Sequence, residues 1–101
     1  MAHPAHVREW ADRFAVLGDP SRLRLLLLVH REGPISVTDL AAASGLRPTA
    51  VSHALRLLRI ARTIEAAREG RSTLYRLVDP VTADLLDHVP DPPAALLENG
   101  S

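Results

Sequence analysis

The chain has 101 residues, of which 47% are hydrophobic and 3% aromatic, with no cysteine and a formal net charge of zero. This length and composition favour one mainly helical domain over residues 1–101, with a mobile arm over 1–5 and a tail over 90–101. The lack of cysteine excludes thiolate metal sites and thiol redox chemistry from these residues. Since the sequence has neither a signal peptide pattern nor an apolar run of about 18 residues, we expect a cytoplasmic protein with no membrane partner.

Two helices are predicted first. Apolar residues at spacings of three and four predict an amphipathic helix over about residues 5–18, and they are Val7, Trp10, Phe14 and Leu17. Asp19 and Pro20 have the form of an N-cap followed by a first helical position, so they open a second helix that runs to residue 30 or 31. That second helix is apolar on nearly all sides and is therefore expected at the centre of the fold.

A helix-turn-helix arrangement is predicted next. Ile35 is expected to be a single strand residue, and a short helix should follow over residues 37–44. Gly45 can take the left-handed conformation that ends such a helix. A tight turn then leads to a second helix from Pro48, whose buried stripe consists of Val51, Leu55 and Leu58.

The opposite face of this second helix suits nucleic acid. It carries Arg47, Thr49, Ser52, His53, Arg56 and Arg59. Hydroxyl and imidazole groups hydrogen-bond phosphates or base edges, and a guanidinium pairs with phosphate or with guanine. Residues 44–76 hold seven arginines against two acids, whereas residues 77–101 hold five acids and no arginine. Such a basic middle third predicts a polyanionic partner, although an ordinary solvated helix face is the plain alternative.

A hairpin and a last helix complete the chain. From Thr63 the apolar pattern changes to a period of two, which predicts a β-hairpin whose tip is Glu69 and Gly70. This end of the hairpin presents a small polar and basic group, formed by Arg68, Arg71 and Ser72. The last helix is expected over about residues 81–89, with Val81 and Leu85 on one side.

The sequence gives no support for an enzyme. Ser52, His53 and Asp39 could be written as a catalytic triad. Adjacent residues on a helix point about 100° apart, however, so His53 cannot act as a base on the Ser52 hydroxyl. The sequence contains no glycine-rich phosphate loop and no nucleophile elbow. We therefore predict no catalytic residues.

The predicted order is helix, helix, strand, helix, helix, strand, strand, helix, which is a winged helix-turn-helix. The chain here resembles the ArsR/SmtB family of transcriptional repressors. The resemblance rests on residues 14–24, 37–41, 50–55 and 71–77, which are similar to the family's opening "LadptRlrIL", its "v-x-eLa", its "svSrHL" and its second wing strand. Ala54 and Arg62 depart from the family, which usually has histidine and often glycine at these places.

This resemblance implies a homodimer on operator DNA. Two recognition helices would enter successive major grooves of a palindromic operator, and the hairpins, or wings, would lie over flanking minor grooves. The residues support a dimer independently, because the seam at Val7, Trp10, Phe14 and Leu17 and the face at Val81 and Leu85 leave a small core no obvious room for both. Two alternatives stay open. In the first, the two apolar faces pack on the core of their own chain and form no dimer. In the second, the winged helix binds a protein partner.

Metal sensing is common in proteins that resemble this family, but its usual ligand sets are missing here. Residues 36–39 replace the family's Cys-x-Cys pair. Of the set on the C-terminal helix only Asp79 is kept, since Val81, Pro92 and Ala95 fill the other places. The sequence therefore requires no cofactor, and a separate sensor protein could read the signal for this chain.

A nickel site in the N-terminal arm is the remaining metal hypothesis. Once Met1 is removed, the α-amine of Ala2, the next amide nitrogen and the imidazole of His3 can chelate one ion, and such sites favour Ni(II) or Cu(II). Some nickel- and cobalt-responsive relatives resemble this chain in having an N-terminal histidine. His6 and His88 could add donors, although solvated surface histidines are the plain alternative.

Overall fold

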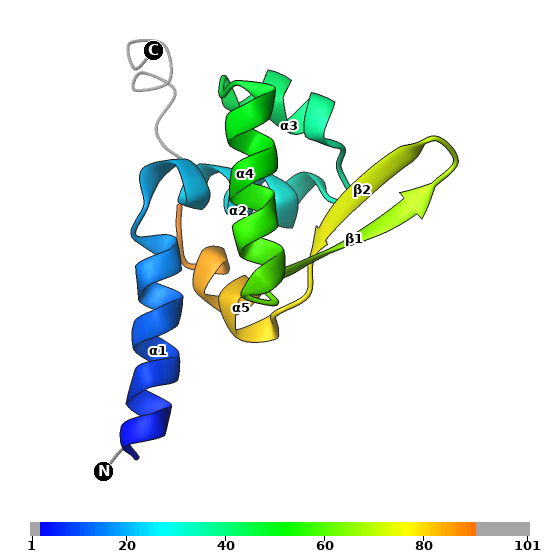
Figure 1. Ribbon diagram of the computed structural model, residues 1–101. Coiled ribbons are helices and arrows are strands. Elements are labelled where there is room, and N and C mark those ends of the chain that lie inside the picture. The colour runs from blue at the N-terminus through cyan, green and yellow to red at the C-terminus, as the bar shows by residue number, and fades with distance from the viewer. Residues whose placement is uncertain (1–2, 91–101) are drawn as a thin grey trace, which may run out of the picture.

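The computed structural model describes residues 3–90, which form five helices and one two-stranded antiparallel sheet (Figure 1). In chain order the elements are α1 (Pro4–Leu17), α2 (Pro20–Glu32), α3 (Val37–Ser44), α4 (Pro48–Ile60), β1 (Ile64–Glu69), β2 (Ser72–Leu77) and α5 (Pro80–Asp87). Ile35 forms an isolated bridge with Tyr75, as expected for a single strand residue. The predicted winged helix-turn-helix is confirmed. Within residues 3–90, no helix is long and apolar enough to cross a membrane.

The second helix lies at the centre of the fold, as its composition predicts. α2 contacts α1, α3, α5 and β2, and its residues Leu25, Leu26 and Val29 are buried. They pack with Leu40 of α3 and with the apolar stripe of α4 in one core. By contrast α1 and the hairpin extend away from this core in different directions (Figure 1).

Local capping signals set the starts and ends of the central helices. The Asp19 carboxylate accepts a 2.9 Å hydrogen bond from the N–H of Arg22, at the start of α2. The Ser36 hydroxyl accepts a 3.1 Å bond from the N–H of Asp39 at the start of α3. Gly45 ends α3 with a φ of 76°, in the left-handed region that favours glycine. The predictions for Asp19 and Gly45 are confirmed, and the Ser36 bond marks the predicted start of the short helix.

The start of α1 corrects the expected mobile arm over residues 1–5. The helix begins at Pro4, and the Nδ1 atom of His3 accepts a 3.1 Å hydrogen bond from the N–H of Ala5. Proline at the first helical position loses no intrahelical bond, because that N–H has no partner in the helix. Residues 3–5 are therefore a cap and a first turn. Residues 1–2 and the predicted tail beyond residue 90 lie outside the described range.

Two further element ends differ from the prediction. Glu69 pairs with Ser72, so the two-residue loop of the hairpin is Gly70-Arg71 and not Glu69-Gly70. Gly70 has a φ of 62° at the first loop position, where a type II′ turn requires a positive value. At the C-terminal end α5 stops at Asp87, two residues before the predicted limit, and His88 is its C-cap.

Candidate nucleic-acid interface

Helix α4 is held against the core by one face only. Val51, Ala54, Leu55 and Leu58 are buried, which confirms the predicted stripe and adds Ala54 to it. The residues predicted to contact DNA are all exposed on this helix and at its start, and they are Arg47, Thr49, Ser52, His53 and Arg56. The fold therefore presents this polar face outward, as a recognition helix requires.

The hairpin presents a second basic group. Arg68, Arg71 and Ser72 are exposed at its outer end, as predicted. Arg68 donates a weak hydrogen bond of 3.4 Å from Nε to the carbonyl oxygen of Gly70. Nearer the base of the hairpin, Arg76 is paired with Glu65 through a 2.8 Å bond. The positive charge of the wing is thus concentrated toward its tip.

The twelve arginines divide into two groups when their contacts are considered. Six make side-chain hydrogen bonds to other residues, and they are Arg13, Arg22, Arg24, Arg31, Arg68 and Arg76. The other six make none with the part of the chain that the structure describes, and they are Arg8, Arg47, Arg56, Arg59, Arg62 and Arg71. Five of these six lie on α4, next to it or at the wing tip.

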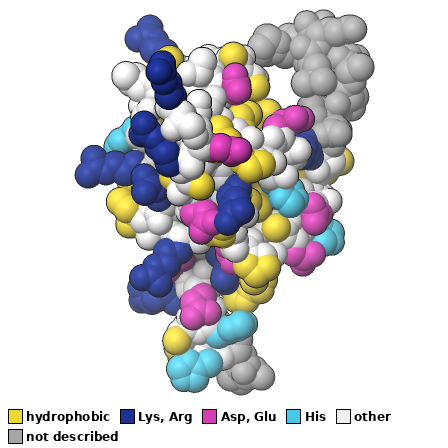
Figure 2. Space-filling view, turned by 90° about the vertical axis from the view of Figure 1, so that its right-hand side faces the viewer, with side chains coloured by type: hydrophobic (Ala, Val, Ile, Leu, Met, Phe, Trp, Pro, Cys, Tyr) yellow, Lys and Arg dark blue, Asp and Glu magenta, His cyan; other side chains and the backbone are white. Residues whose placement is uncertain are grey.

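The surface view agrees with this division. Figure 2 is seen from the side of the wing, so the exposed front of α4 in Figure 1 lies toward its left. Arginine side chains gather on that left side, while most acidic side chains lie toward the centre and right. The basic residues therefore form a face and are not spread evenly over the molecule.

Several exposed residues extend the predicted site. Arg59, which the sequence already places on the polar face of α4, is exposed, and Arg62, which the sequence does not indicate, follows the helix with a positive φ of 60°. Leu57 and Ile60 are apolar yet 41% and 71% exposed on the same helix. Leu57 and Ile60 do not fall on the apolar stripe of Val51, Leu55 and Leu58, and this spacing could have indicated that they are exposed.

The apolar side chains predicted at the dimer interface remain partly exposed to solvent in a single chain. α1 has no buried residue, and Val7 and Phe14 are 53% and 56% exposed. Trp10 packs against Phe14 with a 5.9 Å distance between ring centroids. Leu17 differs from the rest of the seam, because it packs against the chain's own core. Val81 and Leu85 on α5 are partly exposed, and their contact with a second copy stays a prediction.

A charged contact joins α1 to α5. Nε of Arg13 donates to Oδ2 of Asp79 at 3.1 Å, and the Thr82 hydroxyl donates to the same oxygen at 2.5 Å. Burial raises the pKa of Asp79, but these bonds and the Arg13 charge outweigh it and hold that pKa below its ordinary value of 3.8. Beside this contact lies an open cavity of about 560 Å³ between α1, α5 and the turn after α4.

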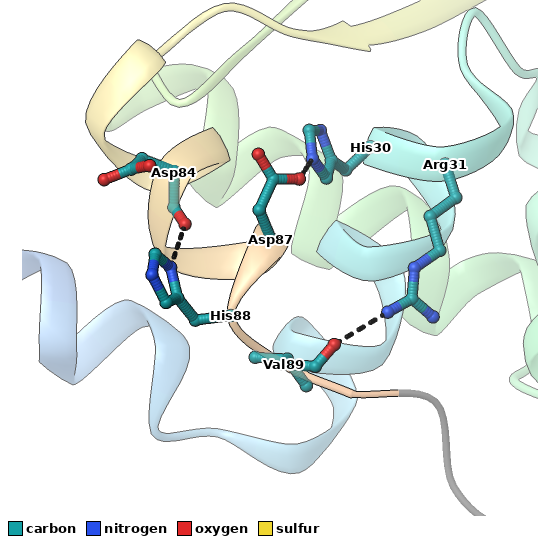
Figure 3. A network of polar contacts seen from close by, with 6 residues as sticks. All are labelled: His30, Arg31, Asp84, Asp87, His88 and Val89. Atoms are coloured by element: carbon teal, nitrogen blue, oxygen red, sulfur yellow. Dashed lines mark hydrogen bonds and ion pairs between the residues drawn. The ribbon is translucent and has the colours of Figure 1, made fainter.

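The other end of α5 is held by α2 (Figure 3). His30 and Asp87 are joined by a 2.6 Å contact between Nε2 and Oδ1. Arg31 donates to the carbonyl oxygen of Val89 at 3.0 Å, and Nδ1 of His88 donates to the carbonyl oxygen of Asp84 at 2.8 Å. Both ends of α5 are therefore fixed to other helices.

The residues predicted to hold a metal are not assembled within one chain. His3 caps α1, and His6 accepts a 3.0 Å hydrogen bond from the indole N–H of Trp10. His88 is engaged at the end of α5, and Ala2 lies outside the described range. Among residues 3–90, no three histidine, cysteine, aspartate or glutamate side chains converge to hold an ion.

Comparison with known proteins identifies the family. The model for "Bacterial regulatory protein, arsR family" matches residues 19–66. The crystal structure of AntR, an antimony-specific transcriptional repressor, is 40% identical, covers 97% of this chain and 85% of its own, and superposes with a TM-score of 0.79. The chain belongs to the arsR family. The ArsR/SmtB resemblance is thus confirmed, and the family comprises DNA-binding transcription regulators and not enzymes.

One further sequence relative and one further solved structure are similar to this chain. The HTH-type transcriptional regulator NmtR of Mycobacterium tuberculosis is 47% identical over 77 residues, or 76% of this chain. The chain spans 63% of the length of that relative. A homodimeric winged helix-turn-helix domain from Mycobacterium bovis, solved by NMR, is 28% identical with a TM-score of 0.70 and covers 95% of this chain and 81% of its own.

Proposed function

We propose that this chain is a transcriptional repressor that binds a palindromic operator as a homodimer. The observation that carries the proposal is the division of the arginines. The arginines whose side chains make no hydrogen bond within residues 3–90 are concentrated on α4, just after it and at the wing tip, where a winged helix-turn-helix meets DNA. The homodimeric neighbour and the exposed apolar residues of α1 support two copies on one site.

The individual contacts follow from side-chain chemistry. Ser52, His53 and Arg56 lie in the middle of the exposed face of α4, so they read base edges in the major groove. Arg47 and Thr49 lie at the start of the helix and contact phosphate or bases there. Arg68, Arg71 and Ser72 of the wing contact the backbone of the flanking DNA.

A binding experiment tests this function. Duplexes from the chain's own promoter, and scrambled duplexes of equal length, are titrated by fluorescence anisotropy at several salt concentrations. Wild-type protein should prefer the promoter duplex and show a steep salt dependence. Replacing Ser52, His53 and Arg56 together by alanine should remove that preference, with Arg8→Ala on α1 as the matched control. Unchanged specific binding by the triple variant would refute the recognition helix and favour a protein-interaction module.

A response to Ni(II) is a second and separate proposal, supported by the histidines at the N-terminus. The described residues of one chain do not make a complete site, so His3 would need donors from outside residues 3–90, such as the Ala2 amine. The Nδ1 atom of His3 already accepts the cap bond of α1, and metal at that atom would compete with the cap. No cysteine is present to provide the thiolates that soft ions prefer.

Calorimetry on untagged protein tests the nickel proposal. Wild-type protein should bind Ni(II) more tightly than Zn(II), because a nitrogen-rich chelate favours nickel. His3→Ala with His6→Ala should abolish that binding and any nickel effect on DNA affinity, whereas His53→Ala should retain the binding. If the double variant binds nickel like wild type, the N-terminal site is wrong. The signal is then read elsewhere, for example by a separate sensor protein.

A further inference from the structure

Arg24 lies on α2, outside the surface assigned to DNA, yet its guanidinium reaches the helix-turn-helix. Its Nη1 atom donates a 3.0 Å hydrogen bond to the main-chain carbonyl oxygen of Ser44. Ser44 is the last residue of α3, so this oxygen is among those that the helix leaves without an internal partner. A positive charge at this position also complements the helix dipole. Arg24 therefore holds the C-terminal end of α3 against α2.

Leu46 packs against the core, and the other contacts of the turn beyond Ser44 are local hydrogen bonds. Gly45 adopts its left-handed conformation, and the N–H of Leu46 donates to the Ser44 hydroxyl oxygen at 3.1 Å. The N-terminus of α4 has no side-chain cap, because its N-cap residue Arg47 makes no such bond. The direction in which α4 leaves the turn therefore depends on where Ser44 is held as well as on the packing of its buried stripe.

The same chemistry occurs three times on α2. Three of its arginines bind carbonyl oxygens at or near the C-terminal ends of three different helices. They are Arg22 with Ala15 and Val16 of α1, Arg24 with Ser44 of α3, and Arg31 with Val89 after α5. Only the bond from Arg24 fixes a residue that leads directly into the recognition helix.

We propose that Arg24 is a positioning residue for α4. By holding Ser44 it sets the angle at which α4 presents its exposed face, and it thereby raises the affinity for the operator without touching DNA. This inference rests on the proposed DNA-binding function. The competing account is a direct contact between Arg24 and a phosphate, and the two accounts differ in their dependence on salt.

Three variants test the proposal. Arg24→Met keeps the apolar part of the side chain and removes its donors, Arg24→Lys keeps the charge and a donor, and Arg22→Met removes the equivalent bonds at α1. Arg24→Met should weaken operator binding about ten-fold, as for one bond from a charged donor. Binding to scrambled DNA and the salt slope should stay unchanged. Arg24→Lys should recover most of the affinity, and Arg22→Met should retain the wild-type preference for the operator.

Other results would overturn it. Equal losses on operator and scrambled duplexes, with a salt slope lower by about one, would make Arg24 a phosphate contact. Amide hydrogen exchange gives a readout without DNA, since the Leu46 amide should exchange faster in Arg24→Met while that of Val29 stays protected. If the Leu46 amide exchanges at the same rate in Arg24→Met as in wild type, the positioning role is refuted while the proposed DNA-binding function is not. A wild-type protein that prefers no duplex would refute the proposed function and the role of Arg24 in it.

Discussion

Replacing Phe14 by alanine tests the dimer most directly. In the single chain the Phe14 side chain is 56% exposed, and its ring neighbour Trp10 lies on the same helix. α1 has no buried residue, so Phe14 adds little to the chain's own core. If α1 forms the dimer seam, the substitution should affect association far more than folding.

The size of the effect can be worked from the exposed surface. An aromatic side chain offers roughly 200 Å² to bury, so the 56% that is exposed corresponds to roughly 110 Å². At about 25 cal/mol per Å² this is about 3 kcal/mol for each copy. Twofold symmetry brings two copies into the interface, which gives about 5 to 6 kcal/mol. Only part of the free energy calculated from buried area appears as binding free energy. We therefore expect the dimer dissociation constant to rise at least about one hundred-fold.

Sedimentation equilibrium measures this change. Wild-type protein should be a dimer at tens of micromolar, and Phe14→Ala should be mainly monomeric there with its helical circular dichroism retained. Arg8→Ala is the matched control, because Arg8 is an exposed α1 residue outside the seam. The reasoning is refuted if wild type is monomeric, or if Phe14→Ala dissociates within a few-fold of the wild-type constant.

Two further predictions concern stability. Gly45→Ala should lower the free energy of unfolding by about 1 to 2 kcal/mol through its left-handed backbone alone, because a Cβ there meets no atom within 4 Å; a neutral result in urea denaturation would contradict this. Asp79→Asn should destabilise the chain at neutral pH. Since the folded pKa of Asp79 lies below 3.8, its contribution is present above that pH and lost as the pH falls through the folded value. The difference between wild type and variant should therefore narrow only below about pH 4, and a difference that already narrows near pH 6 would exclude Asp79 as its source.

The elements that could be predicted are those with local causes. The bounds of α3 follow from the Ser36 cap and from Gly45, both of which act within a few residues. The buried stripe of α4 follows from apolar spacing along one helix. For the same reason the exposure of the polar residues of α4 could be predicted, whereas the exposed apolar residues Leu57 and Ile60 were not part of that prediction.

The features that could not be predicted depend on packing between distant segments. Arg13 and Asp79 are 66 residues apart and meet only because the fold brings the start of α5 next to α1. Arg24 and Ser44 meet across the contact between α2 and α3, and no spacing in the sequence encodes that bond. The observed hairpin loop lies one residue beyond the predicted one, because Glu69 continues the strand pairing and Gly70 takes the position that needs a positive φ.

A net charge of zero does not oppose DNA binding in this chain, and the reason lies in the contacts of its arginines. Charge counted along the sequence treats all twelve alike, but Arg13 and Arg76 are paired with carboxylates, and Arg22, Arg24 and Arg31 bind carbonyl oxygens. These five arginines hold helices and strands together, so their guanidinium groups are already engaged by other parts of the fold. The arginines that make no hydrogen bond within residues 3–90 are concentrated on α4, just after it and at the wing tip. The local field on that face, and not the net charge of the chain, determines whether DNA is attracted there.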